Sequence, residues 1–364
     1  ESLCLSNCDG VIWKEQYVPR TVRNIYSHSK SFTSLMVGIA IDEGKLSYDM
    51  KLVDVFQDEI NEETYHRLSK ITVKHLLMMA SGFGKGYLFG DQKRAGMGYP
   101  DYLKFMLERE LIDEPGAKFT YSNGDTYLVS RMVSKVYNKS FKQLCYEKIF
   151  IPLEIGLPIW GCDPNGYCTA ASELCLSCEE MNRLGVLFLN KGIYKERRVV
   201  SSEYVEMCSK PQIKTDGWGD YSFQFWMVPE VDGYRADGAY GQLTIIFPKE
   251  GYVLSFQRPE DERLSRVLEI LREDKEHCMR LPMKADARAL NLSNCAAIIV
   301  YECLRQLDYP GLSHVEVQKG EDGLIPFSFE DEAKDFWIQY YIPMLESVKP
   351  KQSAVETINK ILFS

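Results

Sequence analysis

The sequence predicts an α+β protein with antiparallel strands, from two observations. Apolar residues recur at helical spacing through the middle of the chain. Short β-rich runs, separated by Gly, Pro and charged turns, lie on both sides of that helical middle, at 2–17 and 221–256. Of the 364 residues, 45% are apolar and 26% are charged, which is typical of a globular chain. A chain of this length predicts two structural units.

At the start of the chain, residues 2–6 and 11–17 predict two strands around the turn-rich Asn7-Cys8-Asp9-Gly10. Residues 82–98 contain six glycines and predict a long loop, which either covers a cleft or is an ordinary surface loop. Helices are expected where apolar residues recur every three or four positions. They are predicted over 32–43, 72–79, 102–108, 126–137 and 174–190.

Strands return after the helical middle, where β-branched and aromatic residues alternate with turn residues. They are predicted over 221–228, 234–236, 243–248 and 252–256. A helix over 262–273 completes the first predicted unit, residues 1–275. Residues 276–364 form a predicted appendage that is mostly helical. Its helices are expected over 296–307, 331–345 and 354–362.

The charge and the cysteine usage limit the partners and the compartment. The net charge is −9 and the pI is near 5.3, which makes nucleic acid an improbable partner. No run of about 18 apolar residues is present, and no signal peptide is recognisable, so we expect no membrane segment. The eleven cysteines are odd in number and dispersed, unlike those of a secreted disulfide scaffold. A cytoplasmic location with reduced thiols is the expectation.

Neither cysteines nor histidines suggest a metal. Cys175 and Cys178 form one Cys-x-x-Cys, interpreted as two small apolar residues on a helix, with a redox or metal role as the alternative. The histidines lack the spacing of metal ligands, so we expect no metal and no cofactor. They are His28, His66, His75, His277 and His314.

Ser27 and Lys30 form a Ser-x-x-Lys sequence immediately before a predicted helix. This spacing places the lysine one turn beyond the serine, on the same face. A serine hydroxyl needs a base within hydrogen-bond distance to become a nucleophile, and a partly desolvated lysine can serve. The alternative is an ordinary helix cap at the surface.

Tyr121, Ser122 and Asn123 form a second candidate element. A tyrosine beside a lysine ammonium ionises more easily and can pass a proton to a leaving group. The asparagine can orient the lysine or bind the substrate. A turn with an ordinary tyrosine is the alternative.

The third candidate element runs from Ala236 through Asp237, Gly238 and Ala239 to Gln242, followed by a predicted strand. A strand with small residues at a sheet edge allows a substrate carbonyl to approach the backbone closely. A backbone N–H in such a strand can stabilise an oxyanion.

These three elements, in this order, resemble the serine β-lactamase and penicillin-binding-protein superfamily, and most closely the class C-type branch of esterases and 6-aminohexanoate-dimer hydrolases. The stretch Ile39–Leu46 is similar to that family's first active-site helix, and Met79-Ala80-Ser81-Gly82 to a Met-x-Ser-Gly turn. The resemblance implies an antiparallel sheet flanked by helices, with a helical subdomain. It covers about residues 2–275.

The resemblance assigns roles to the matching residues. Ser27 would form the acyl-enzyme, Lys30 would be its base, and Tyr121 would activate water and protonate the leaving group. Asn123 would orient Lys30 and the substrate. The backbone N–H groups of Ser27 and Ala239 would form the oxyanion hole. The implied substrate is a small ester or amide, and the implied class is a serine hydrolase.

One position departs from the family pattern. The third motif usually starts with Lys or His, whose charge binds a substrate carboxylate, but this chain has Ala236 and Asp237 there. We therefore expect neutral or cationic substrates rather than β-lactams. Arg235 either compensates in part or is an exposed strand charge. Asp237, Gly238 and Trp218 are the expected substrate contacts.

Other aromatic residues near Trp218 either line the cleft or belong to the core. They are Tyr221, Phe223, Phe225 and Trp226. An alternative to the hydrolase is a catalytically weak acyl-binding sensor of the same fold, which the altered third motif suggests.

A short stretch, 279–312, resembles the last motif of SPOUT tRNA 2′-O-methyltransferases. In that resemblance Leu281, Ala289 and Asn291 would lie at S-adenosylmethionine. The family's glycine-rich earlier half has no counterpart in this chain. A structural role of the fragment is therefore expected, and a methyltransferase-related function is the further alternative.

Overall fold

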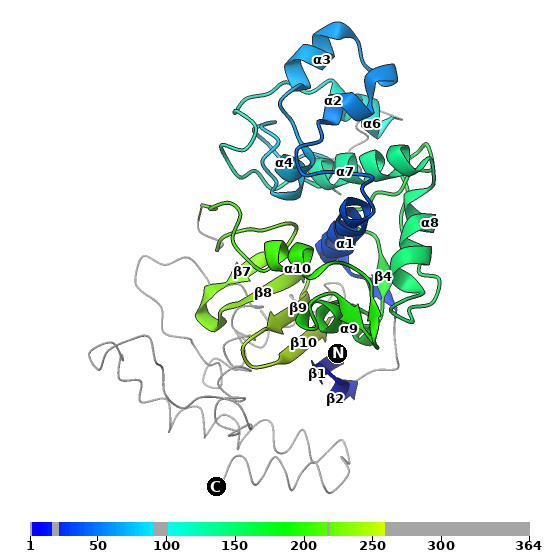
Figure 1. Ribbon diagram of the computed structural model, residues 1–364, viewed down its shortest axis with the longest axis vertical. Coiled ribbons are helices and arrows are strands. Elements are labelled where there is room, and N and C mark those ends of the chain that lie inside the picture. The colour runs from blue at the N-terminus through cyan, green and yellow to red at the C-terminus, as the bar shows by residue number, and fades with distance from the viewer. Residues whose placement is uncertain (1, 17–21, 90–100, 217–218, 259–364) are drawn as a thin grey trace, which may run out of the picture. The chain divides into compact units, whose positions relative to one another are not determined.

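The computed structural model describes residues 2–16, 22–89, 101–216 and 219–258 (Figure 1). The chain divides into two units, Glu1–Pro259 and Glu260–Ser364, and all described residues belong to the first. Within the described residues, none of the helices combines the length and apolar character needed to cross a bilayer. The predicted appendage 276–364 and the helix predicted over 262–273 lie outside the described residues.

One antiparallel sheet of six strands forms the base of this unit, in the order β2-β1-β10-β9-β8-β7. β1 (Ser2–Asn7) pairs with β2 (Gly10–Gln16) around the predicted turn, and it also pairs with β10. The two ends of the unit therefore join in one sheet. The remaining strands are β7 (Trp226–Val228), β8 (Gly233–Gly238), β9 (Gln242–Phe247) and β10 (Tyr252–Gln257).

Two short ladders lie outside this sheet. β3 (Arg23–Asn24) pairs with β4 (Cys175–Leu176), and β5 (Ile193–Tyr194) pairs with β6 (Arg197–Arg198). The β3–β4 ladder joins two segments that are far apart in the sequence, just before the nucleophile candidate Ser27.

The helices form two groups (Figure 1). α9 (Cys178–Leu189) packs against β1, β9 and β10, and α10 (Ser202–Cys208) follows it. A Cβ atom at Gly185 of α9 would lie 2.3 Å from Val253, so only glycine permits this close contact. The second group surrounds α7 away from the sheet. It comprises α2 (Leu52–Val55), α3 (Glu62–Leu68), α4 (Val73–Leu77), α6 (Tyr102–Leu107), α7 (Asn123–Tyr137) and α8 (Phe141–Cys145).

α1 (Ser29–Asp42) lies between the sheet and the helices around α7 (Figure 1). It is buried from Ser29 to Ala40, which excludes the alternative of a surface helix cap. Its polar side chains are satisfied by backbone carbonyls, as where Thr33 Oγ1 donates to Ala170 O at 2.8 Å. Hydrogen bonding of this kind is what allows polar residues in a core.

The α+β prediction and most elements are confirmed, but five boundaries are wrong. The helix predicted over 174–190 begins only at Cys178, because Ser177 caps it and Cys175 belongs to β4. The strand predicted over 221–228 is regular only from Trp226, and the strand predicted over 234–236 extends over Gly233–Gly238. The helices predicted over 32–43 and 126–137 each begin three residues earlier, at Ser29 and Asn123. The sequence did not predict four short helices, which are α2, α3, α8 and α10.

Candidate functional site

Ser27 lies in a single 3-10 turn, Tyr26–His28, that leads directly into α1. Tyr26 adopts a left-handed φ of +49°, which is strained for a non-glycine residue. Two hydrogen bonds hold the turn: Asn24 Oδ1 accepts from Tyr26 N at 2.8 Å, and Ser29 Oγ donates to Tyr26 O at 2.6 Å. Ser27 is partly exposed, so its hydroxyl is accessible.

Lys30 is 1% exposed and occupies the first turn of α1. Its Nζ donates to Ser27 Oγ at 3.1 Å, to Asn123 Oδ1 at 2.6 Å and to Ala171 O at 2.9 Å. The predicted placement of the serine and lysine on one face is therefore confirmed. The amine is fixed against the hydroxyl by partners from two other segments of the chain.

Tyr121 lies just before Ser122, whose side chain caps α7 by accepting from Gly124 N at 3.1 Å. The Tyr121 ring centroid lies 4.9 Å from Lys30 Nζ, and the Ser27 side chain interacts with the phenol. Burial raises the pKa of Tyr121 above its ordinary value, and the interaction with Ser27 offsets part of that increase. The phenol is therefore protonated in this structure, despite the expectation that the lysine would ease its ionisation.

The third predicted element is the end of β8 and the turn after it. A Cβ atom at Gly238 would lie 2.2 Å from Ile25 O and 3.1 Å from His28 N, so β8 touches the backbone on either side of Ser27. Ala239 follows immediately, in the exposed three-residue turn to β9. This strand is second from the sheet edge. β8 pairs with β7 only from Gly233 to Arg235. Within the described part of the chain, residues 236–238 therefore have no strand partner on that side.

Asp237 and Arg235 lie on the same face of β8 and form an ion pair, with Nε and Oδ2 3.0 Å apart. Arg235 is 4% exposed, so the interpretation as an exposed strand charge is wrong. The Asp237 side chain is 15% exposed. Burial raises the pKa of Asp237, and the Arg235 guanidinium partly offsets this. The two charges balance each other beside the site.

Aromatic rings surround the exposed side of Tyr121. Trp226 stacks on it at 5.9 Å, Phe89 at 6.4 Å, and Phe119 lies 6.4 Å away. Tyr121 and these three rings are partly exposed and can contact a ligand. The guanidinium of Arg235 lies 6.0 Å from the Trp226 ring.

Three of the other aromatic candidates belong to the core and do not line the site. Tyr221, Phe223 and Phe225 are at most 1% exposed and belong to the core. Trp218 lies outside the described residues. The described part of the glycine-rich loop contacts the site, because Leu88 O accepts from Asn123 Nδ2 at 3.1 Å.

His28 is excluded as a group that acts on the nucleophile. Its Nε2 lies 2.9 Å from Thr244 Oγ1 in β9, and burial lowers its pKa to about 3. The ring is therefore neutral and belongs to the core between α1 and the sheet.

Two functional positions were not predicted from the sequence. Ala171 contributes a backbone carbonyl to Lys30, a role that any residue type could have, so no sequence signal exists for it.

Asp125 lies in the first turn of α7 and is fully buried. It accepts from Ser81 Oγ at 2.9 Å and from Ser81 N at 3.4 Å. It therefore joins the Met79-Ala80-Ser81-Gly82 turn to the Tyr121-Ser122-Asn123 element.

Burial raises the pKa of Asp125 to about 7. Because this folded-state pKa lies above the ordinary value near 4, the native state binds the extra proton, and Asp125 costs stability as pH rises from about 4 to 7. We expect Asp125→Asn to remove this cost, at about 1.4 kcal/mol per unit of pKa difference. Urea unfolding at pH 5 and pH 8 measures it. The stability gained by the variant should be larger at pH 8, and equal gains at both pH values would contradict the assignment.

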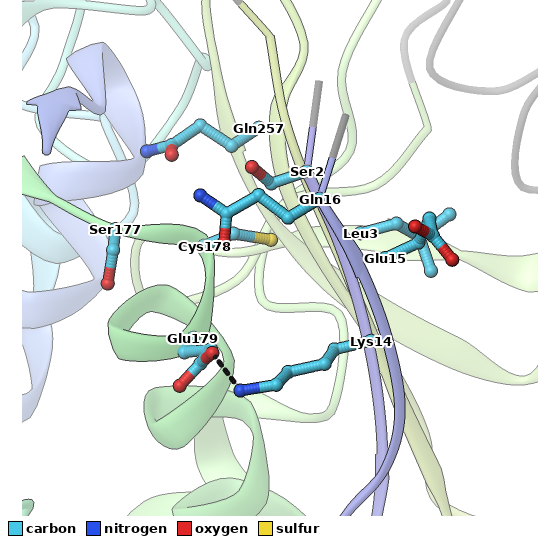
Figure 2. Close-up of a pocket in the computed structure, with 9 residues that line it drawn as sticks. All are labelled: Ser2, Leu3, Lys14, Glu15, Gln16, Ser177, Cys178, Glu179 and Gln257. Carbon is cyan, nitrogen blue, oxygen red and sulfur yellow. Dashed lines mark hydrogen bonds and ion pairs between the residues drawn. The ribbon is translucent and has the colours of Figure 1, made fainter. Parts of the chain in front are cut away.

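A separate pocket of about 280 Å³ lies between β2 and the start of α9 (Figure 2). The Lys14–Glu179 ion pair, 2.7 Å long, crosses it, and Cys178 lines it. Cys175 is on β4 and Cys178 begins α9, so the interpretation of both as residues of one helix is wrong. Within the described ranges, no group of three or more His, Cys, Asp or Glu side chains is arranged to hold a metal ion.

The comparisons with known proteins agree with this fold. A family model described as Beta-lactamase matches residues 9–263. A putative 6-aminohexanoate-dimer hydrolase from Bacillus anthracis is 18% identical, with a TM-score of 0.58 over 78% of this chain and 80% of that one. A family VIII carboxylesterase is 14% identical, with a TM-score of 0.56 over 74% of this chain and 90% of that one. At these identities the two structures establish a shared fold.

A curated sequence gives a different, shorter match. A putative tRNA (cytidine(34)-2′-O)-methyltransferase from Geobacillus stearothermophilus is 58% identical over 45 residues, which is 12% of this chain and 29% of that protein. The chain thus spans less than a third of the length of that relative. This agrees in part with the predicted resemblance of 279–312, whose candidates Leu281, Ala289 and Asn291 lie outside the described residues.

Proposed function

The chain belongs to the Beta-lactamase family, and we propose that it is a serine hydrolase that forms an acyl-enzyme on Ser27. The fold and the family predicted from the three motifs are confirmed. The observation that carries the proposal is the convergence of four side chains from two helix starts. Lys30 Nζ contacts both Ser27 Oγ and Asn123 Oδ1, and it lies 4.9 Å from the centroid of the Tyr121 ring.

Acylation follows from these contacts. Lys30, in its neutral form, takes the proton from Ser27 Oγ over the 3.1 Å hydrogen bond while the oxygen attacks a carbonyl carbon. The backbone N–H groups of Ser27 and Ala239 are the proposed oxyanion donors. Their proposed role is supported by the contact of Gly238 with the nucleophile turn, which brings the end of β8 to the reacting carbonyl.

Tyr121 is proposed as the group that protonates the leaving group. Its position beside Ser27 and Lys30 supports this role, because a phenol holds its proton at neutral pH and can donate it to a group that leaves from the same site. Donation leaves a phenolate, which then accepts a proton from water and starts deacylation. Lys30 lies close enough to stabilise that negative charge, with its Nζ 4.9 Å from the ring centroid.

Covalent labelling tests the proposal. We expect a fluorophosphonate probe to add once to the full chain, and the labelled peptide to contain Ser27. Intact-mass spectrometry followed by peptide mapping measures both. Labelling at another serine, or none at a probe concentration that labels a related esterase, would refute the acyl-enzyme proposal.

The substrate is proposed to be a small, uncharged ester or amide. The supporting observation is that Asp237 pairs with Arg235 and so leaves no net positive charge on β8 for a substrate carboxylate. The partly exposed rings around Tyr121 favour an apolar group on the substrate.

Asp237→Asn is therefore expected to change charge preference. Removing the acid leaves Arg235 unpaired, and one charge interaction is worth about 1 kcal/mol or more near a protein surface. We expect kcat/KM for a carboxylated ester, mono-p-nitrophenyl glutarate, to rise about tenfold relative to p-nitrophenyl butyrate. The matched control is Asp232→Asn, which removes an acid from the exposed Lys249 pair at the other end of β8. An equal change in both variants would contradict the proposal.

Two alternatives have their own tests. An acyl-binding sensor would label at Ser27 but retain the acyl group, so the ester would be cleaved once per chain instead of continuously. The altered third motif at Asp237 favours this candidate. A methyltransferase-related function of 279–312 requires S-adenosylmethionine binding, which isothermal calorimetry on the full chain measures.

A further inference from the structure

Cys162 and Cys168 face each other across a tight hairpin. They form an antiparallel bridge pair, and both are free thiols. The flanking hydrogen bonds are Asp163 N to Tyr167 O at 2.7 Å and Thr169 N to Gly161 O at 3.0 Å. These bonds lie on either side of the pair, so the cysteines occupy a non-hydrogen-bonded position of the ladder.

That position has the dimensions of a disulfide. Directly opposite residues at non-hydrogen-bonded positions have Cα atoms about 4.5 Å apart, with both side chains on one face. Disulfides join residues whose Cα atoms are about 4.4–6.8 Å apart. The two cysteines therefore need only side-chain rotation, with little movement of the backbone, to bond.

The hairpin is fixed in this register by its turn. Asp163 Oδ1 accepts from Asn165 N and Tyr167 N, both at 2.9 Å, and Asp163 Oδ2 accepts from Tyr127 of α7 at 2.5 Å. Gly166 supplies the left-handed φ of +83° that the turn requires. The opposition of the two thiols is thus built into the fold.

The surroundings of the two thiols differ. Cys162 is exposed, and its Sγ accepts a hydrogen bond from Lys142 Nζ at 3.5 Å. Cys168 is buried, and burial raises the pKa of its thiol. Cys162 is therefore suited to attack an oxidant, and Cys168 to react second.

We propose that Cys162 and Cys168 are a modification site, a dithiol that peroxide converts to a disulfide. The Cys162 thiolate attacks hydrogen peroxide and breaks its O–O bond, which gives a sulfenic acid and, after protonation, water. The Cys168 thiol then attacks the sulfenic sulfur, the S–O bond breaks, and a second water leaves. Two thiols are oxidised and one peroxide is reduced to two waters.

The hairpin is connected to the candidate site by adjacent backbone. Thr169 leads into Ala170 and Ala171, whose carbonyls accept from Thr33 and Lys30 of α1. Gly161 N donates to Glu173 O at 3.1 Å, and Glu173 N donates to Asn24 Oδ1, the atom that also holds the nucleophile turn. Disulfides most often span about 5.5–6 Å between Cα atoms, so closing this one moves the two strands slightly apart, and we expect a small displacement of the supports of Lys30 and Ser27. This consequence rests on the proposed function, but the disulfide does not.

The experiment treats the full chain with hydrogen peroxide, alkylates the remaining thiols and maps the peptides without reduction. The expected product is a disulfide-linked peptide that contains Cys162 and Cys168 and is lighter by two hydrogen atoms than the reduced form. Dithiothreitol should reduce this disulfide. In Cys168→Ser, dimedone should trap a sulfenic acid at Cys162. Cys175→Ser is the matched control and should leave the 162–168 link unchanged. A link from Cys168 to Cys145, or overoxidation of Cys162 with no link, would overturn the proposal.

A second measurement separates the site from its consequence. The rate of fluorophosphonate labelling is expected to fall about tenfold or more in the oxidised chain, since small displacements of reacting groups have large effects on rate. Cys162→Ser cannot form the link, so with or without peroxide it should be labelled as fast as the chain whose two thiols are reduced. An unchanged rate in a chain with the link would overturn the connection to the active site, and a missing link would overturn the modification site whatever the labelling result.

Discussion

Ser27→Ala is expected to abolish turnover, with kcat lowered on the order of 10⁴- to 10⁶-fold. The proposed reaction requires an oxygen nucleophile within reach of Lys30, and the hydroxyl is the group that Lys30 Nζ contacts at 3.1 Å. The methyl group of alanine removes both the nucleophile and the hydroxyl that interacts with Tyr121. Hydrolysis of p-nitrophenyl butyrate measures the loss, and covalent labelling should disappear with it.

The fold should tolerate this change. Ser27 is partly exposed, and the turn is held by Asn24 and Ser29 rather than by the Ser27 side chain. The control is Ser209→Ala, which removes a surface hydroxyl bonded to Glu206 O. It should keep full activity. Substantial turnover in Ser27→Ala with an unchanged melting temperature would refute Ser27 as the nucleophile.

Lys30→Met is expected to lower kcat by about 10²- to 10⁴-fold, the range for loss of a positioned base. Methionine approximates the length of lysine but carries no amine. It leaves Asn123 Oδ1 and Ala171 O without this donor, and each unsatisfied buried acceptor costs about 1–3 kcal/mol. It also removes the cost of burying an amine, so the two effects on stability oppose each other.

The matched control for Lys30→Met is Lys139→Met, which removes a half-buried lysine paired with Glu147 at 2.7 Å. We expect loss of that pair to lower its stability only slightly and to leave its kcat unchanged. The measurement is the pH–rate profile of ester hydrolysis beside thermal unfolding of both variants. If Lys30→Met keeps more than about a tenth of the activity at every pH, Lys30 is not the base.

Some of the site was predictable because its chemistry is local in sequence. Ser27 and Lys30 are one helical turn apart, and Tyr121 and Asn123 flank a single cap residue, so spacing fixes which side chains can act together. Their mutual approach, across 93 positions between Lys30 and Asn123, was inferred from the family resemblance rather than from periodicity.

Other predictions failed where tertiary contacts override local pattern. Arg235 has the sequence context of an exposed strand charge, but the fold buries it against Asp237 and Trp226. The stretch before Cys178 continues a helical pattern, but Asn24 pairs with Cys175 across 151 positions and makes it a strand. In both cases the neighbouring residues in the sequence do not reveal which distant contact the residue makes.

The sequence by itself determined the α+β class, the family and the residues proposed for acyl transfer, because apolar periodicity and short motifs depend on neighbouring residues. The tertiary structure alone decided which groups hold those residues in place. A backbone carbonyl at Ala171 and a buried carboxylate at Asp125 support the site, and the ion pair on β8 sets its charge. These roles arise from burial and from contacts between distant segments, and local sequence carries no record of either.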